Sequence, residues 1–206
     1  MAIDWHDFGF KASIDRLIAQ LSCKVFLGDE LCRNEDWLRV TTDYTRHVIR
    51  AAEALRLWPK IVHPIVALFL KSTRQIRWEV QAARDIITPI LEKRRENKVA
   101  AVKQGKAPEI NNNALQWMEE VSKGRLYDPA IMQLTFATTA ILTTSDMLTQ
   151  AIFDLCGKET LVQELRDEIV TVLQEEGLKK TAMYKLQLMD SFLKESQRMK
   201  PIGIGK

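Results

Sequence analysis

Apolar residues recur at three- and four-residue steps along most of the chain, which is the period of an α-helix. The clearest case follows Asn34, a favourable N-cap with two acidic residues behind it, where acids suit the helix dipole. This pattern predicts a helix over residues 35–56. A second helical pattern covers residues 65–97 and contains Pro89, where we expect a kink or a split.

The second half of the chain opens with a predicted loop over residues 98–113, which hold a glycine, a proline and three consecutive asparagines. Asp128-Pro129 predicts the start of a long helix, because the aspartate caps it and the proline needs no donor in the first turn. Helices are expected over residues 114–122, 129–156, 159–176 and 182–199. Strand signals are few, so the predicted fold class is mainly α.

The composition excludes some classes of protein but does not indicate a specific function. The 206 residues are 46% hydrophobic and 28% charged, which is typical of a globular protein, and the net charge of +3 is too small to indicate a nucleic-acid partner. None of the three cysteines belongs to a C-x-x-C pair, so no disulfide framework is expected. We expect Cys23, Cys32 and Cys156 to be packed small hydrophobic side chains.

Targeting and metal signals are equally sparse. The first residues lack the basic and apolar regions of a signal peptide, and no apolar run approaches the length of a membrane span. The histidines at positions 6, 47 and 63 are too scattered for a zinc site. No membrane anchor or metal site is therefore expected within this chain.

The helix predicted over residues 129–156 carries the first candidate chemistry. Only Asp146 and Asp154 are charged within it, and a helix that is apolar nearly all round is expected to be buried. Ala140 and Thr144 are four residues apart and share a face, where a small residue beside a hydroxyl leaves room for a flat ligand. The alternative is a packing seam whose hydroxyls bond to the backbone.

The last predicted helix carries a carboxylate–arginine pair. Glu195 and Arg198 are three residues apart and share a face, and a buried pair of this kind could pin a loop through the planar guanidinium group. E-x-x-R occurs four times in the chain, and most such pairs are solvated contacts worth about 0–1 kcal/mol. The surrounding sequence has to decide which of them matters.

That surrounding sequence is MDSFLKESQRMKP at residues 189–201, which resembles the K-helix signature of cytochrome P450 monooxygenases. The helix over 129–156 is similar to the I helix of that family, whose pattern Ala/Gly-Gly-x-Asp/Glu-Thr-Thr/Ser falls on residues 140–145. Segments 25–45 and 115–130 resemble fungal members, nearest to the ent-kaurene oxidase and indole-diterpene oxidase type.

The resemblance implies a single partial cytochrome P450 domain over residues 1–206, corresponding to about helices D to K of the family fold. By the same resemblance, Thr144 would hold water and help deliver protons to dioxygen, and Ala140 would lie against the haem face. Glu195 and Arg198 would form the structural pair that stabilises the core on the haem side.

The sequence differs from the family pattern at two positions of the predicted I helix and lacks one element of the family. Ile141 stands where the family usually has glycine and Thr143 where it has an acid, which excludes an acid relay through position 143. The family's haem ligand is a cysteine in a loop that follows the K helix, and this chain does not contain that loop. We therefore expect a truncated fragment without the axial cysteine, inactive when isolated.

The function implied for the full-length parent is haem-thiolate monooxygenation of an apolar, terpenoid-like substrate. It would use O2 and electrons from NADPH-cytochrome P450 reductase at the endoplasmic reticulum membrane, although no anchor is encoded in this chain. Residues 58–70 would fall in the region between the family's F and G helices, which borders substrate access and the membrane surface. The alternative is a non-catalytic helical remnant or interaction domain without a cofactor.

Overall fold

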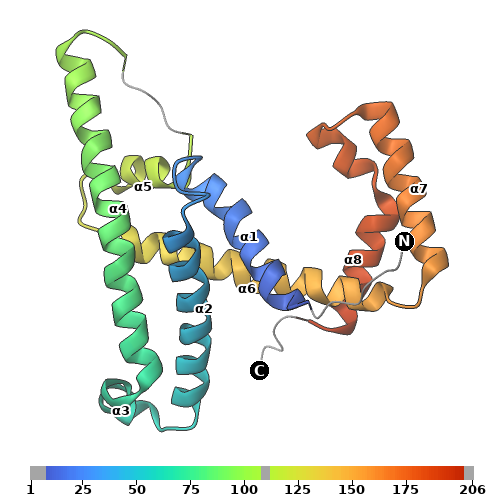
Figure 1. Ribbon diagram of the computed structural model, residues 1–206, viewed down its shortest axis with the longest axis horizontal. Helices are drawn as coiled ribbons and strands as arrows, with labels where there is room; N and C mark the ends of the chain where they lie inside the picture. Colours follow the sequence, from blue (N-terminus) through green and yellow to red (C-terminus); the bar gives the residue numbers. More distant parts are fainter. Residues whose placement is uncertain (1–7, 108–111, 202–206) are drawn as a thin grey trace. The chain divides into compact units, whose positions relative to one another are not determined.

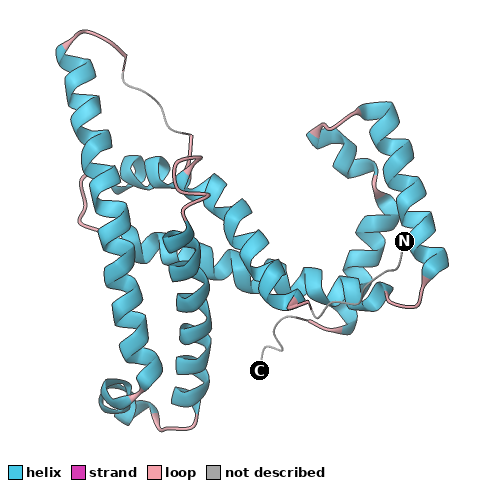
Figure 2. Cartoon of the chain, viewed as in Figure 1, coloured by secondary structure: helices cyan, strands magenta, loops and turns pink. Residues whose placement is uncertain are grey.

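The structure is a computed structural model that describes residues 8–107 and 112–201. Within these residues it contains helices and loops but no strand (Figure 2), which confirms the mainly α fold class. The 3₁₀ helices are η1 (Lys60–Val62) and η2 (Lys180–Lys185). The α-helices, labelled in Figure 1, are α1 (Phe10–Leu27), α2 (Glu35–Arg56), α3 (His63–Phe69), α4 (Lys71–Lys103), α5 (Ala114–Ser122), α6 (Pro129–Leu155), α7 (Glu159–Glu176) and α8 (Gln187–Met199).

The chain divides into two compact units, residues 1–142 and 143–206, with the boundary inside α6. In the first unit α2 and α4 pack along each other and are joined through η1 and α3 (Figure 1). Its core takes one fully buried side chain from each of five helices. These are Leu27 of α1, Trp37 of α2, Ile87 of α4, Leu115 of α5 and Leu134 of α6.

Helix starts follow the capping signals in the sequence. The Asn34 side chain accepts a hydrogen bond from the Trp37 N–H at 2.8 Å, so α2 covers the predicted residues 35–56. Asp128 Oδ1 accepts hydrogen bonds from the N–H groups of Ala130 and Ile131 at 2.9 and 3.2 Å. Both predicted caps are therefore confirmed.

The long helix α4 differs from its prediction at both ends and in the middle. The break lies at Leu70, which is extended, and α4 then runs through Pro89 without ending. Pro89 faces solvent, so water can bond to the backbone carbonyl that the proline leaves without a donor. The helix continues to Lys103, because alanines in this segment favour helix, and the loop predicted over 98–113 starts later. Residues 108–111 of that loop lie outside the described residues.

In the second unit α7 packs against η2 and α8. The prediction placed the last helix over residues 182–199, but its first residues belong to η2 and α8 begins at Gln187. Gly157, at φ +73°, follows the end of α6 as expected. No helix in the described part of the chain is long and apolar enough to cross a membrane.

Candidate functional site

The start of α6 is fixed by Asp128. Its Oδ2 accepts a hydrogen bond from Arg84 Nε of α4 at 2.9 Å, while Oδ1 caps the helix. Partial burial raises the pKa of Asp128, but the hydrogen bonds from Arg84 and from two backbone N–H groups outweigh it and leave this pKa below its usual value. A charged aspartate therefore ties α6 to α4 at neutral pH.

The middle of α6 has one buried and one exposed face, so the expectation that it is buried nearly all round is wrong. The Thr135 and Thr139 hydroxyls are exposed and donate to the carbonyls of residues 131 and 135 at 2.8 and 2.9 Å. Bonding to a backbone carbonyl one turn earlier lets threonine lie on an exposed helix face. The buried face is formed by Leu134, Ala137, Ile141 and Ser145.

Ala140 and Thr144 follow one another at a four-residue step on α6. Ala140 is half-buried and Thr144 is exposed, while Ile141 between them points into the core and is only 2% exposed. The methyl group of Ala140 and the hydroxyl of Thr144 are predicted to face a ligand from neighbouring turns of this helix. Their roles remain predictions.

Glu195 and Arg198 of α8 form a two-pronged ion pair. Arg198 Nε and one of its terminal nitrogens donate to the two carboxylate oxygens at 2.7 and 2.6 Å. This hydrogen bonding lowers the pKa of Glu195. The side chains are 59% and 67% exposed, so this is a surface pair within the chain and not the buried pair considered from the sequence.

The other E-x-x-R candidates behave differently. Arg95 pairs with Glu119 at 2.6 Å rather than with Glu92, and Glu30 lies 3.7 Å from Arg94 rather than pairing with Arg33. In contrast, Glu195 and Arg198 bind each other in the bidentate geometry.

Contacts at both ends hold α8 in place, and the sequence reasoning missed them. The Glu168 carboxylate of α7 accepts hydrogen bonds from the N–H groups of Leu188 and Met189 at 2.7 and 3.0 Å, which caps α8 from another helix. In the last turn, the buried Ser196 hydroxyl donates to Asp154 of α6 at 2.6 Å. That hydroxyl is the largest influence lowering the pKa of Asp154.

The sequence draws attention to both residues of the second contact, but it does not show that they meet. Asp154 is one of two charged residues in α6, and Ser196 lies inside the E-S-Q-R motif. Two cavities flank Ser196: one of about 270 Å³ beside Gln150 and Phe153, and an apolar one of about 520 Å³ beside Leu161 and Phe192. The Asp154–Ser196 bond therefore sets how α8 presents Glu195 and Arg198.

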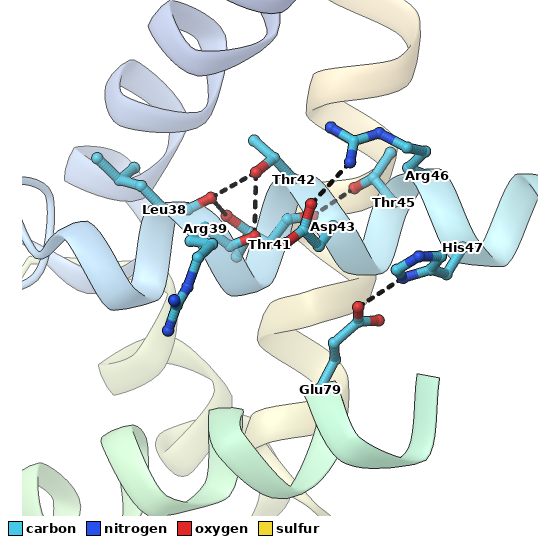
Figure 3. Close-up of polar contacts among 9 residues, drawn as sticks. All are labelled: Leu38, Arg39, Thr41, Thr42, Asp43, Thr45, Arg46, His47 and Glu79. Carbon is cyan, nitrogen blue, oxygen red and sulfur yellow. Dashed lines mark hydrogen bonds and ion pairs between the residues drawn. The ribbon is translucent and has the colours of Figure 1, made fainter. Parts of the chain in front are cut away.

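A second polar cluster joins α2 to its neighbours in the first unit (Figure 3). The Thr45 hydroxyl lies 3.2 Å from the Thr138 hydroxyl of α6, and this contact fixes α2 beside the segment that leads to Ala140. Two residues further along α2, His47 meets Glu79 of α4, with 2.5 Å between Nδ1 and Oε1. These contacts were not anticipated from the sequence, because 93 and 32 residues separate the partners.

The cysteines do not present a ligand for haem iron. Cys23 and Cys32 lie in the core, and burial raises the pKa of Cys23 to about 12, so it stays a thiol, whereas metals bind the thiolate. Cys156 is exposed at the end of α6, which corrects the expectation that it is packed. No cluster of metal-ligating side chains occurs among the described residues. That Ala140 and Thr144 lie beside a flat cofactor stays a prediction.

Known fungal proteins are similar to this chain along nearly its whole length. The sequence profile of the family Cytochrome P450 matches residues 6–205. Cytochrome P450 monooxygenase adrA of Penicillium rubens is 49% identical over 203 residues, which cover 98% of this chain and 40% of that protein. Cytochrome P450 monooxygenase esdpI of Penicillium shearii is 46% identical over 98% of this chain and 39% of its own length.

A third relative, cytochrome P450 monooxygenase 1 of Gibberella fujikuroi, is 44% identical over 98% of this chain and 46% of its own length. The chain thus spans less than half the length of these curated relatives. The match is continuous through α6 and α8, the helices that carry the candidate residues. Profile and relatives agree that the chain belongs to the cytochrome P450 family.

Proposed function

We propose that this chain forms part of a haem-thiolate monooxygenase that inserts oxygen into an apolar, terpenoid-like small molecule. O2 is the oxygen source and NADPH-cytochrome P450 reductase delivers the electrons. The observation that carries the proposal is the 41–49% identity to fungal cytochrome P450 monooxygenases over nearly the whole chain. When bound through a cysteine thiolate, the haem supplies the activation of dioxygen.

The residues of α6 act on the reaction from one side of the cofactor. The Thr144 hydroxyl holds a water and passes protons toward the reacting oxygen, because it is exposed and free to rotate as donor or acceptor. The small side chain of Ala140 leaves room next to Thr144, since a larger side chain would occupy the space of the oxygen or the substrate. The backbone of α6, fixed in the core through Ile141, holds both in position.

Glu195 and Arg198 act as a structural pair. In this chain both are exposed and already aligned by their bidentate contact, so the guanidinium retains unused donors for a further segment of the protein. We infer that such a segment packs over α8 on the haem side and buries the pair. A buried charge pair with satisfied hydrogen bonds would then specify that packing.

The connection between α2 and α4 presents an apolar tip. Large side chains that are more than half exposed gather there: Leu57, Trp58, Ile61, Ile65, Leu68 and Phe69. Exposed apolar patches of this kind mark contact with a lipid surface, a ligand or another protein. We infer that this tip borders the path of the apolar substrate and rests on the endoplasmic reticulum membrane.

The isolated chain is proposed to be inactive, because the thiolate must come from a part of the protein beyond these residues. Haemin titration of the purified chain, followed by reduction and addition of carbon monoxide, tests this. We expect no red-shifted Soret band. A thiolate-type band would show that one of the three cysteines ligates the iron and would overturn the inactivity claim.

The function itself is tested in a chimera that carries this segment in place of the matching 203 residues of the Penicillium rubens relative. We expect a folded chimera with the thiolate-type carbon monoxide spectrum, in which Thr144→Ala lowers product formed per NADPH consumed. The matched control is Thr143→Ala. A chimera that is helical by circular dichroism but takes up no haem would refute the proposal, and an unchanged yield in Thr144→Ala would refute the role of that threonine.

A further inference from the structure

His47 and Glu79 lie face to face between the two longest helices of the residue 1–142 unit (Figure 3). Their side chains are only 12% and 13% exposed, and Nδ1 of the imidazole lies 2.5 Å from Oε1 of the carboxyl group. A contact this short and this well shielded is a hydrogen bond that water does not replace. The pair therefore fastens α2 to α4 from inside the interface.

The second carboxyl oxygen shows which form of the pair the site favours. Oε2 of Glu79 is buried and has no hydrogen-bond partner among the described residues. A carboxylate would place half of its negative charge on this shielded atom, which is costly to bury without a donor. A carboxylic acid with its proton on Oε1 leaves only a neutral carbonyl oxygen there.

Apart from His47 itself, the charges around Glu79 do not stabilise a carboxylate there. On α2, Asp43 disfavours negative charge at Glu79, and Arg46, which favours it, is exposed and already pairs with Asp43 at 2.8 Å. Tyr44, also on α2, is partly buried beside the carboxyl group and carries no positive charge. On α3, which packs against both helices, the imidazole of His63 lies 2.9 Å from the Trp58 carbonyl instead.

We propose that Glu79 and His47 form a neutral acid–imidazole latch, in which the carboxyl O–H donates to Nδ1 and whose deprotonation loosens α2 from α4. The proton on Oε1 requires the His47 tautomer with hydrogen on Nε2. Burial raises the pKa of Glu79, and hydrogen bonding and charge from His47 lower it without cancelling the rise. The latch does not depend on haem or on the activity proposed above.

The direction of the pH dependence follows from this shift. The folded-state pKa of Glu79 lies above its ordinary value of 4.5, so its contribution to stability is complete below that value. The contribution is lost as the pH rises through the folded-state pKa. Between the two values the folding equilibrium constant falls by up to about tenfold per pH unit relative to a variant that cannot titrate there.

Unfolding of the full chain in urea, followed by tryptophan fluorescence, measures this effect. All five tryptophans fall within residues 1–142, so the signal reports the unit that holds the latch. We expect the wild type to lose stability relative to Glu79→Gln as the pH rises from 4.5, because glutamine keeps a neutral donor toward Nδ1. The exposed Glu53→Gln on α2 is the matched control and should follow the wild type.

Two outcomes of this experiment contradict the latch. A stability difference that moves in favour of the wild type with rising pH would identify an ordinary ion pair. A constant difference would mean that Glu79 titrates as it does in the unfolded chain.

Measurements on the wild type keep the proposal testable if Glu79→Gln does not fold. Infrared spectroscopy above pH 4.5 should show the C=O stretch of a protonated, shielded carboxylic acid, and ¹⁵N spectra should show His47 protonated at Nε2 alone. Absence of that stretch in the folded chain just above pH 4.5, or a doubly protonated His47 there, would overturn the proposal.

Discussion

Asn113 offers the sharpest test of how the residue 1–142 unit is held together, because its side chain is used twice. Oδ1 accepts the Gln116 N–H at 3.1 Å and caps α5, while Nδ2 donates to the Leu27 carbonyl at the end of α1, 3.3 Å away. The side chain is 4% exposed, so water cannot substitute for either contact. We expect Asn113→Ala to lose both at once.

The expected loss of stability in Asn113→Ala is the sum of the costs of these two contacts. Loss of an N-cap side chain costs about 1 kcal/mol. Loss of the second hydrogen bond costs about 0.5–1.5 kcal/mol, at the lower end here because Arg94 also donates to the Leu27 carbonyl, at 3.2 Å. Together the free energy of unfolding should fall by about 2 kcal/mol, which is roughly thirtyfold in the folding equilibrium constant.

The assay is urea unfolding followed by tryptophan fluorescence, which reports this unit alone. Asn112→Ala is the matched control, since Asn112 is an exposed neighbour of the same type and should shift stability by less than about 0.5 kcal/mol. Asn113→Asp keeps the capping oxygen and loses the amide donor, so it should lie between the wild type and Asn113→Ala. If Asn113→Ala were no more destabilising than Asn112→Ala, the double role would be refuted.

Three further substitutions test other contacts. Glu168→Ala should speed hydrogen exchange of the first amides of α8 about tenfold, whereas Glu164→Ala, on an exposed turn of α7, should leave it unchanged. Gly28→Ala should cost about 1–3 kcal/mol and more than Gly105→Ala; both glycines have positive φ, but only at Gly28 would a Cβ meet another side chain, at 3.1 Å. Equal losses of stability in the two variants would show that the contact of the new Cβ at position 28 contributes nothing. Pro89→Ala should raise the free energy of unfolding by about 1–3 kcal/mol in the fluorescence assay, because an exposed residue gains a helical hydrogen bond, and a loss would show that the proline shapes α4.

Helix starts could be predicted from the sequence because their causes are local. Asn34 and Asp128 lie within three residues of the N–H groups they cap, so residue type and spacing were sufficient. The prediction of a break at Pro89 was wrong. A proline breaks a helix only where water cannot replace the lost hydrogen bond. The family assignment also came from local motifs, and the sequence profile confirms it.

The contacts that organise the candidate site could not be predicted, since they join residues far apart in the chain. Glu168 reaches the start of α8 across 20 residues, and Asp154 meets Ser196 across 42. Each residue type is ordinary at its position, and only the packing of the helices shows its partner. The same holds for His47 and Glu79, which periodicity places on helices without saying that they meet.

The central helix α6 shows why hydropathy alone misjudged burial. Threonine counts as nearly apolar, yet Thr135 and Thr139 lie on the exposed face, where their hydroxyls bond to backbone carbonyls one turn earlier. The two hydroxyls on that face therefore have acceptors within the helix itself. The opposite face is held in the core by Leu134 and Ile141. The helix is therefore fixed on one side by apolar packing and accessible on the other, although its sequence is apolar nearly all round.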